Sequence, residues 1–359
     1  MKTPYQLKPK KLAFVYYRFA IRFFLSIFFY LVGYLIANIF IKLSWVHFFI
    51  LFLLQNLYTF IYLRIKYKKQ IYTFYQDRIV FTTGGIFSEY KVELVIRNIT
   101  NISLNLPLIE NNFFNVGNII IQSAGKVSIR LEYIDNPREV YNYLIKLMHQ
   151  NTFSLEMKYP LQKETPNTLG VFFEVFRNFF GVLVFIFWVL IVFIAERGFY
   201  FISNLSRNFN LIIILIVIFL LSLLIKEVLT FLDLKSRKYV IYRDTITYSE
   251  GFLTKNYTII PIENLSDSEL TQTVVDRIFG LYDVKISCQG SGAEILFRNM
   301  VNGPKIEECI DKLITSKNIS KQARDEVKSE YSTQLSQKRQ VADVITNNSY
   351  TANFSMNWY

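Results

Sequence analysis

The side chains best suited to nucleophilic or metal chemistry are few in this sequence and stand far apart. It has two histidines, His47 and His149, and two cysteines, Cys288 and Cys309. A Ser–His–Asp hydrolase would need a histidine near a strained serine turn, and neither histidine has one. The cysteines lie 21 residues apart without neighbouring ligands, which is not the spacing of a zinc site. We therefore expect no catalytic residue, no metal and no cofactor.

Two glycine-rich segments could hold a phosphate or form a tight turn. Gly290-Ser-Gly292 lacks the Lys-Ser or Lys-Thr that follows a phosphate-binding loop, so we interpret it as a hairpin turn. Gly84-Gly85 is predicted to be a second hairpin turn, in which glycine permits positive φ angles.

Long uncharged stretches are the dominant feature around these few polar groups. Residues 23–41, 43–63, 178–195 and 208–225 contain no Asp, Glu, Lys or Arg, and each is about the length that a helix needs to cross a bilayer. Four such runs argue against buried core helices of a soluble protein. The second run follows the first at once, which argues against a cleaved signal peptide at the N-terminus. They predict two transmembrane hairpins, and the shorter second pair is expected to extend by a turn or more.

The charge distribution predicts the orientation of these hairpins. The formal charge is +12, and residues 1–70 hold eleven Lys and Arg and no acidic residue, whereas residues 71–150 balance seven against seven. Basic residues flank the spans on one side, so both termini and both soluble domains are expected in the cytoplasm, at the cell membrane. The soluble domains are not basic, which argues against nucleic acid as a partner. Anionic lipids are the expected contacts of Arg64, Lys66, Lys68, Lys69, Lys235, Arg237 and Lys238.

Polar residues within the spans have two interpretations. Asn38, His47, Gln55 and Asn56 could line a path for an ion or substrate, or could hydrogen-bond neighbouring helices. We favour helix packing, because a transport path is expected to include a charged residue in mid-span.

An internal repeat with a period near 166 residues organises the chain. Tyr72 to Asp77 matches Tyr239 to Asp244, and Ile96-Arg-Asn98 matches Ile262-Glu-Asn264. Each repeat is a hairpin followed by about 80 soluble residues. We expect the two copies to share one fold, because each repeat of a sequence unit forms the same structure.

Alternating apolar residues predict strands in the soluble part of each repeat. In the first repeat they fall at residues 71–75, 79–83, 92–96, 101–106, 118–122 and 127–133. After Pro137 the period becomes helical, with Val140, Tyr141, Leu144, Leu147 and Met148 on one face, and Pro304 starts the matching helix with Ile306, Cys309, Ile310 and Leu313. Six or seven strands and one closing helix are therefore expected in each repeat.

The predicted domains follow from these patterns. They are a basic cytoplasmic N-terminus (1–22), a transmembrane hairpin (23–63), a β-rich domain (64–150), a linker (151–170), a second hairpin (171–232), a second β-rich domain (233–316) and a polar, partly disordered tail (317–359).

Several motifs resemble the bacterial pleckstrin-homology-like (PH-like) family, the membrane-flanked domain proteins, in tandem form. They are Tyr239-x-x-x-x-Asp244 leading to Gly251-Phe-Leu, the run from Ile259 to Leu265, and Asp276-Arg277-Ile-Phe-Gly280. The first repeat departs from them, with Val95 in place of Pro261, Asn111 in place of Arg277 and Asn115 in place of Gly280. The resemblance covers residues 10 to about 316.

The resemblance implies an α+β membrane protein with four transmembrane helices as two hairpins. Each hairpin would be followed by a cytoplasmic PH-like β-barrel or sheet with one C-terminal helix. The implied function is a non-enzymatic scaffold that binds a membrane or cytoplasmic protein, another copy of itself and membrane lipids, with envelope maintenance as one setting. The alternative is a transporter or lipid-handling protein with a path between the four helices.

Overall fold

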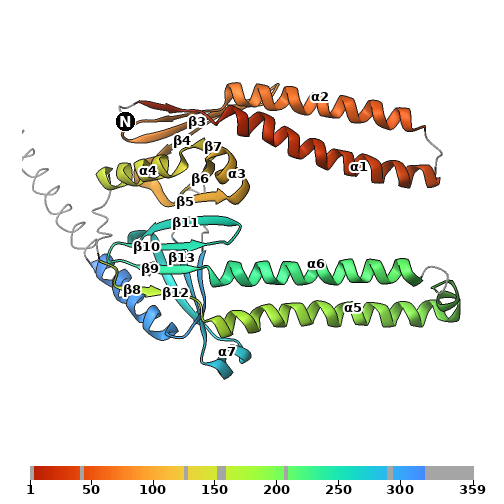
Figure 1. Cartoon of the computed structure of the whole chain (residues 1–359). Coiled ribbons are helices and arrows are strands. Elements are labelled where there is room, and N and C mark those ends of the chain that lie inside the picture. The colour runs from red at the N-terminus through yellow and green to blue at the C-terminus, as the bar shows by residue number, and fades with distance from the viewer. Residues whose placement is uncertain are drawn as a thin grey trace, which may run out of the picture. The chain divides into compact units, whose positions relative to one another are not determined.

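A computed structural model describes residues 4–40, 44–124, 128–151, 159–205, 209–288 and 294–319 of the protein. The chain divides into two compact units, Met1–Glu307 and Glu308–Tyr359. Most of the elements below are labelled in Figure 1, and all belong to the first unit except the helix at residues 303–319, which contains the boundary between the units. Gly290-Ser-Gly292 and the tail beyond residue 319 lie outside the described residues, so the predictions for them stay predictions.

The first hairpin consists of α1 (Arg18–Phe40) and α2 (Trp45–Lys69). Helix α2 begins where the Ser44 side chain accepts a hydrogen bond from the Val46 N–H, as an N-cap does. In the part of the chain described, two helical segments are long and apolar enough to cross a membrane, Leu12–Tyr34 and Trp45–Lys69. They indicate membrane association, and the prediction of four crossing helices goes beyond this finding.

The second hairpin consists of α5 (Thr168–Leu205) and α6 (Phe209–Lys235). Helix α5 starts well before the uncharged stretch at residue 178, and α6 ends well after residue 225. Both helices therefore extend past their uncharged stretches by at least the turn that was predicted.

A short strand precedes each hairpin, which the sequence patterns did not indicate. Strand β1 (Tyr5–Leu7) and strand β8 (Gln162–Glu164) each pair with the first strand after their own hairpin. Strand β1 lies in the segment predicted as a basic N-terminus, and β8 lies in the predicted linker. Each hairpin is therefore inserted between two neighbouring strands of one sheet.

The strands of the first repeat agree closely with the alternating patterns, and the second repeat has the same order of elements. The first repeat has β2 (Ile71–Phe74), β3 (Arg78–Gly84), β4 (Glu89–Val95), β5 (Ile99–Pro107), α3 (Leu108–Phe114), β6 (Val116–Ser123), β7 (Ser128–Asp135) and α4 (Pro137–Asn151). The second has β9 (Lys238–Ile241), β10 (Thr245–Glu250), β11 (Thr254–Pro261), β12 (Leu265–Thr271), α7 (Val274–Phe279), β13 (Tyr282–Cys288), β14 (Glu294–Met300) and a helix at 303–319. With β1 and β8 included, each repeat has seven strands.

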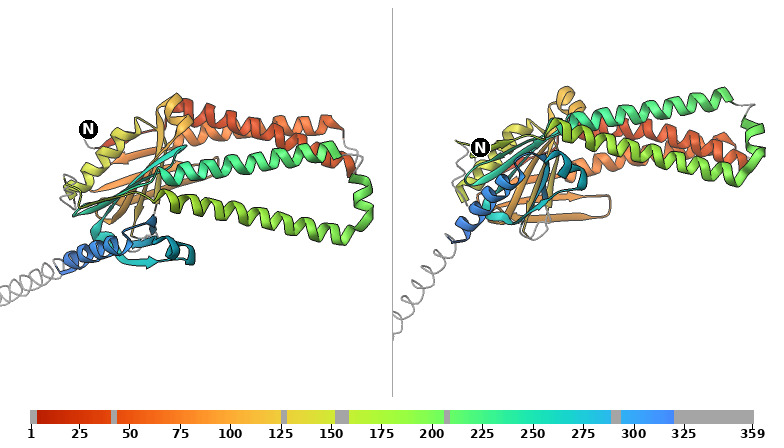
Figure 2. Two further views of the ribbon diagram at one scale, coloured as in Figure 1. Left: turned by 60° about the horizontal axis from the view of Figure 1, so that its bottom comes forward. Right: turned by 90° about the horizontal axis from the view of Figure 1, so that it is seen from below.

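The two repeats share one sheet. Strands β5 and β11 pair antiparallel from Pro107 opposite Thr254 to Ile102 opposite Ile259. The strands form a four-stranded sheet (β1-β2-β3-β4), a seven-stranded sheet (β7-β6-β5-β11-β10-β9-β8) and a three-stranded sheet (β12-β13-β14). Figure 2 shows the seven-stranded sheet, hereafter the fused sheet, from two further directions. The sequence analysis did not anticipate this fusion.

The closing helix of the first repeat covers the core as predicted. All five predicted residues of α4 are buried in the hydrophobic core, together with side chains of β2, β5 and β6 such as Tyr72, Ile102 and Ile119. In the matching helix, Ile306 and Ile310 are buried as predicted, whereas Cys309 and Leu313 are only partly buried.

The repeated tyrosines have one structural role. Tyr72 and Tyr239 are both buried. The Tyr72 hydroxyl donates to the Arg130 carbonyl oxygen (3.1 Å), and the Tyr239 hydroxyl donates to the Leu296 carbonyl oxygen (3.0 Å). The two acceptors are also one period apart, so each tyrosine ties the strand after a hairpin to the last strand of the repeat.

The structure confirms the predicted turn at Gly84-Gly85, although neither glycine uses the positive φ that it permits. The Gly85 N–H donates to the Ser88 carbonyl oxygen (2.9 Å) and closes the hairpin between β3 and β4. Positive φ occurs at Gly251 and Gly280, not at this pair. Gly84 is required by close approach instead, because a Cβ there would lie 2.4 Å from the Ser88 oxygen.

Candidate functional site at the roots of the hairpins

The backbone attaches each hairpin to the last strand of its repeat at an equivalent point. The Lys10 N–H donates to the Tyr133 oxygen (2.8 Å), and the Asn167 N–H donates to the Asn299 oxygen (2.9 Å). Tyr133 and Asn299 both have left-handed φ angles, +53° and +56°, which few non-glycine residues adopt. We call these two attachment points the hairpin roots.

A side chain holds each left-handed residue in place. The Tyr133 N–H donates to Asn118 Oδ1 (2.9 Å), and the Asn299 N–H donates to Asp283 Oδ1 (2.8 Å). Asn118 and Asp283 lie close to one period apart in the sequence. In the structure they bind the same backbone group, and either an amide or a carboxylate oxygen can accept this bond.

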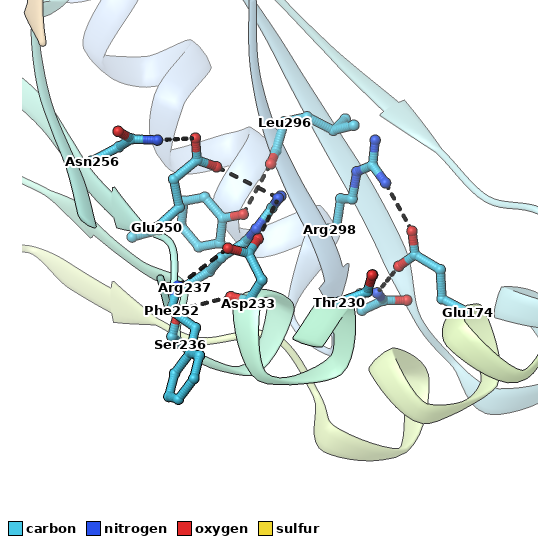
Figure 3. A network of polar contacts seen from close by, with 12 residues as sticks. Glu174, Thr230, Asp233, Ser236, Arg237, Glu250, Phe252, Asn256, Leu296 and Arg298 are labelled. Atoms are coloured by element: carbon cyan, nitrogen blue, oxygen red, sulfur yellow. Dashed lines mark hydrogen bonds and ion pairs between the residues drawn. The ribbon is translucent and has the colours of Figure 1, made fainter. Parts of the chain in front are cut away.

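An ion pair closes each root, with its charges reversed between the repeats. At the first root, Arg18 of the hairpin contacts Glu132 of β7 (3.0 Å). At the second, Glu174 of the hairpin contacts Arg298 of β14 (2.8 Å), as Figure 3 shows, and also accepts a bond from Asn299 Nδ2 (2.7 Å). No sequence pattern indicated either ion pair.

A π-helical turn explains a one-residue offset between the roots. Arg18 lies eight residues after Lys10, whereas Glu174 lies seven after Asn167. Among the described residues, a π-helix occurs at the first root, at Leu12–Tyr17, and not at the second. Such a turn accommodates an extra residue, and it brings Arg18 to the position that Glu174 reaches through an ordinary helix.

A second network fixes the inner end of α6. Arg237 contacts Asp233 of α6 and Glu250 of β10, each at 3.5 Å. Asp233 also accepts a bond from the Phe252 N–H (3.2 Å) in the turn after β10 (Figure 3). Helix α6 is thereby attached to the β10–β11 hairpin.

These contacts bring the inner ends of α1 and α6 to one end of the β5–β11 pair. The Tyr17 ring contacts the Phe114 ring of α3 at 5.1 Å, and α3 directly follows β5. The Leu108 N–H at the start of α3 donates to the Leu253 oxygen, beside the Phe252 that is bonded to α6. Both hairpins are thus attached near the same end of the fused sheet.

A mixed-charge cavity lies at each root. The first, of about 310 Å³, is lined by Arg18, Arg130, Glu110 and Glu132 among others, and the second, of about 210 Å³, by Glu174, Arg298, Asp276 and Asp283. Burial raises the pKa of Glu110 and that of Asp283 above their ordinary values. The cations and carboxylates of both cavities offset one another, so the roots are built to position the hairpins.

Four of the seven predicted lipid contacts are exposed, and within the described part of the chain none of the four forms an ion pair with a carboxylate. These are Arg64, Lys68, Lys235 and Lys238. Arg64 donates to the Tyr16 hydroxyl (3.4 Å), and Lys235 lies over the Phe231 ring.

The other three predicted lipid contacts are partly buried. Lys66 is half-buried with its ammonium 6.0 Å from the centre of the Phe14 ring, and Lys69 pairs with Glu89 at 3.1 Å. Arg237 belongs to the α6 network. Whether any of the seven contacts lipid stays a prediction.

One polar residue of the first hairpin, Asn56, joins the two helices, in agreement with the favoured interpretation of helix packing. Asn56 is buried, and its Nδ2 donates to Ser26 Oγ of α1 (3.2 Å) and to the Phe52 oxygen (2.8 Å). The neighbouring Gln55 is exposed. Asn56 therefore satisfies its amide within the α1–α2 pair.

Both cysteines are free thiols, as expected, and burial makes one of them unreactive. Cys288 is buried at the end of β13 and Cys309 is partly buried. Burial raises the pKa of the Cys288 thiol to about 11, so little thiolate forms at neutral pH.

Comparison with known proteins identifies the repeated domain. A family model described as bacterial PH domain matches residues 24–148 and 176–314. Each match starts inside the first helix of a hairpin and ends in the closing helix of that repeat. No curated protein matches the sequence. The two matches cover most of the chain and confirm the tandem arrangement, and the chain therefore belongs to the bacterial PH domain family.

Proposed function

We propose that this protein is an integral membrane protein whose four long helices hold the fused PH-like domains at the cytoplasmic face of the cell membrane. There the domains act as a non-enzymatic scaffold for a partner protein or for another copy of the chain. The observation that carries the proposal is the attachment of both hairpins at one end of a shared sheet.

Exposed apolar side chains on both hairpins support insertion. Phe24 and Phe29 of α1 are 70% and 68% exposed, and Phe187 of α5 is 66% exposed. Soluble monomers rarely expose large contiguous apolar surfaces, whereas lipid tails would cover these side chains. The attachment of both hairpins near one end of the fused sheet would let them enter the bilayer from the same side.

The exposed cations near the inner helix ends support the orientation. Lys68 and Lys235 lie in the last turns of α2 and α6, where they favour the cytoplasmic side. Each such charge near an anionic surface adds about 1 kcal/mol to membrane attachment.

Two open sheet edges are the surfaces we assign to a partner. Strand β4 is the edge of the four-stranded sheet and β12 is an edge of the three-stranded sheet. They carry Glu89, Lys91, Glu93, Asp267 and Glu269. Charges on an edge discourage indiscriminate strand pairing, so recognition there depends on a partner of matching charge.

Cysteine labelling tests the four-helix arrangement. Single cysteines at Leu43, Ser206 and Thr271 would be introduced into a Cys288→Ala/Cys309→Ala background. We expect a membrane-impermeant maleimide to label positions 43 and 206 from the outer face of intact spheroplasts, and position 271 only after lysis. Labelling of position 43 but not 206 would contradict the second hairpin, and equal labelling at all three sites would contradict insertion altogether.

Photocrosslinking in cells tests the scaffold. A photoreactive residue would replace Lys91 on the open strand β4, or Lys255 on β11, whose edge is occupied by β5. We expect one defined protein, or a second copy, to be captured at position 91 and far less at 255. Capture of lipid alone at both positions would contradict a protein scaffold.

A further inference from the structure

A groove of about 380 Å³ lies between the two repeats, apart from the hairpin roots. Its apolar floor includes Leu104 of β5, Val240 of β9 and Ile259 of β11. Tyr141 of α4 lines it from the first repeat, and Tyr248 and Tyr257 line it from the second. Because both repeats contribute, the groove exists only when β5 and β11 are paired. Its volume falls in the range of small-molecule sites, which often lie between domains.

The charges of this inter-repeat groove are all of one sign. Arg138 at the start of α4 and Lys238 at the start of β9 line it, and no carboxylate does. Both are exposed, and within the described residues neither has an ion-pair partner. The groove is therefore cationic although the second domain carries more acidic than basic residues.

Three other cavities differ from this groove in their charges. Both root cavities combine arginines with Glu or Asp, and a cavity beside α6 combines Lys226 with Asp233. In each of them the protein supplies its own counter-charge. In the inter-repeat groove it does not, so a negatively charged ligand would complete the site.

Hydroxyl groups add uncharged hydrogen-bond donors to the two cations. Tyr141, Tyr248, Ser249 and Thr247 line the groove, and of these the Tyr141 hydroxyl donates to the Tyr257 carbonyl oxygen (3.5 Å). Burial raises the pKa of Tyr141 and that of Tyr248, which keeps both hydroxyls protonated at neutral pH.

We propose that the inter-repeat groove binds an anionic amphiphile, with its phosphate or carboxylate on Arg138 and Lys238 and its apolar part on Leu104, Val240 and Ile259. Lys238 follows the end of α6 by three residues, so the cationic end of the groove lies within roughly 10 Å of chain from the membrane helix. The same chemistry would be offered by an anionic lipid or by a soluble phosphorylated metabolite. An acidic peptide lacks the continuous apolar part that the floor of the groove would cover.

Native mass spectrometry of the full-length protein in a non-ionic detergent tests the proposal. The probes are lysophosphatidylglycerol, lysophosphatidylcholine with the same chain and no net charge, and glycerol 3-phosphate with no chain. We expect lysophosphatidylglycerol to bind at least about tenfold more tightly than lysophosphatidylcholine. Arg138→Ala/Lys238→Ala should remove that preference, since hydrogen bonds to charged groups typically contribute this much.

A matched double variant separates the groove from general charge. Lys146→Ala/Lys255→Ala removes the same net charge, one cation from α4 and one from β11, and neither residue lines the groove. It should bind lysophosphatidylglycerol like the wild type. Equal loss in both double variants, or no loss in either, would overturn the proposal.

The remaining probe identifies the source of the ligand. Glycerol 3-phosphate could bind as tightly as the lipid and depend equally on Arg138 and Lys238. That result would assign the groove to a soluble phosphate and overturn the proposal of an amphiphile. Binding of the lipid alone would support it. Unchanged elution on size exclusion and an unchanged melting temperature would show that the variants are folded.

Discussion

The two hairpin roots have the same geometry and opposite charge order. In the first repeat the helix supplies the cation, Arg18, and the strand supplies the carboxylate, Glu132. In the second the helix supplies Glu174 and the strand Arg298. Both pairs lie next to a left-handed residue that bonds to the segment leading into the hairpin. The roots therefore depend on complementary charge at a fixed place, and the order of the two charges is interchangeable.

The largest test of this comparison is to reverse one charge. Arg298→Glu would place two carboxylates side by side, next to Asp283. Because Arg298 is 39% exposed, we expect a loss of about 2 kcal/mol in stability, less than a fully buried pair would lose. The melting temperature in detergent, followed by size exclusion, measures it.

The double variant Glu174→Arg/Arg298→Glu is the matched control. It copies the charge order of the first root, and we expect it to recover most of the lost stability. If the double variant were as unstable as Arg298→Glu alone, charge complementarity would not be what closes the root.

The ends of the two short helices offer a second comparison. Asn115 ends α3 with φ +50°, and Gly280 ends α7 with φ +62°. Asn adopts this left-handed conformation more readily than other side chains, which is why it can replace the family-like glycine. We expect Gly280→Ala to lower stability by about 1 kcal/mol and Gly280→Asn to lower it less. Thermal unfolding of both variants measures the difference, and equal losses would contradict this account.

The smallest expected effect concerns Asp283. Its raised pKa means that the folded state holds the proton more tightly than the unfolded state, so ionisation of Asp283 lowers stability as pH rises through the folded pKa. Asp283→Asn keeps an acceptor for the Asn299 N–H, as Asn118 does in the first repeat. We expect a slightly higher melting temperature at neutral pH.

That gain should disappear below the ordinary pKa of Asp, where the wild-type carboxyl is protonated in both states. Melting curves of Asp283→Asn and wild type from pH 3.5 to 8 check this. A gain that persists unchanged at the lowest pH would show that ionisation is not its cause.

The elements were predictable because their signals are local. Alternation predicted β2 to β7 within a few residues, and the apolar face after Pro137 predicted the buried side of α4. Strands β1 and β8 were missed because three residues are too short for a period to be recognised.

The fused sheet was missed because strand partners far apart in sequence leave no local pattern. A weaker signal was present, however. The edge strands β4 and β12 carry charges such as Lys91 and Glu269, whereas β5 carries none and β11 only Lys255. Neutral strands are typical of paired positions and charged ones of edges.

The candidate sites were predictable only in part. Basic clusters identified Lys238 but not Arg138, because the groove that joins them forms only after the repeats pair. The ion pairs at the roots join residues more than 110 positions apart, so composition and spacing could not reveal them.

The pairing of β5 with β11 also sets an order of events during synthesis. Strand β5 ends at Pro107 and β11 starts at Thr254, so the ribosome must add roughly 150 residues, including the whole second hairpin, before the edge of β5 finds its partner. At typical elongation rates this takes on the order of 10 s. Throughout that interval the nascent first domain presents an unpaired apolar edge next to the membrane, which is the stage at which a chaperone would have most to protect.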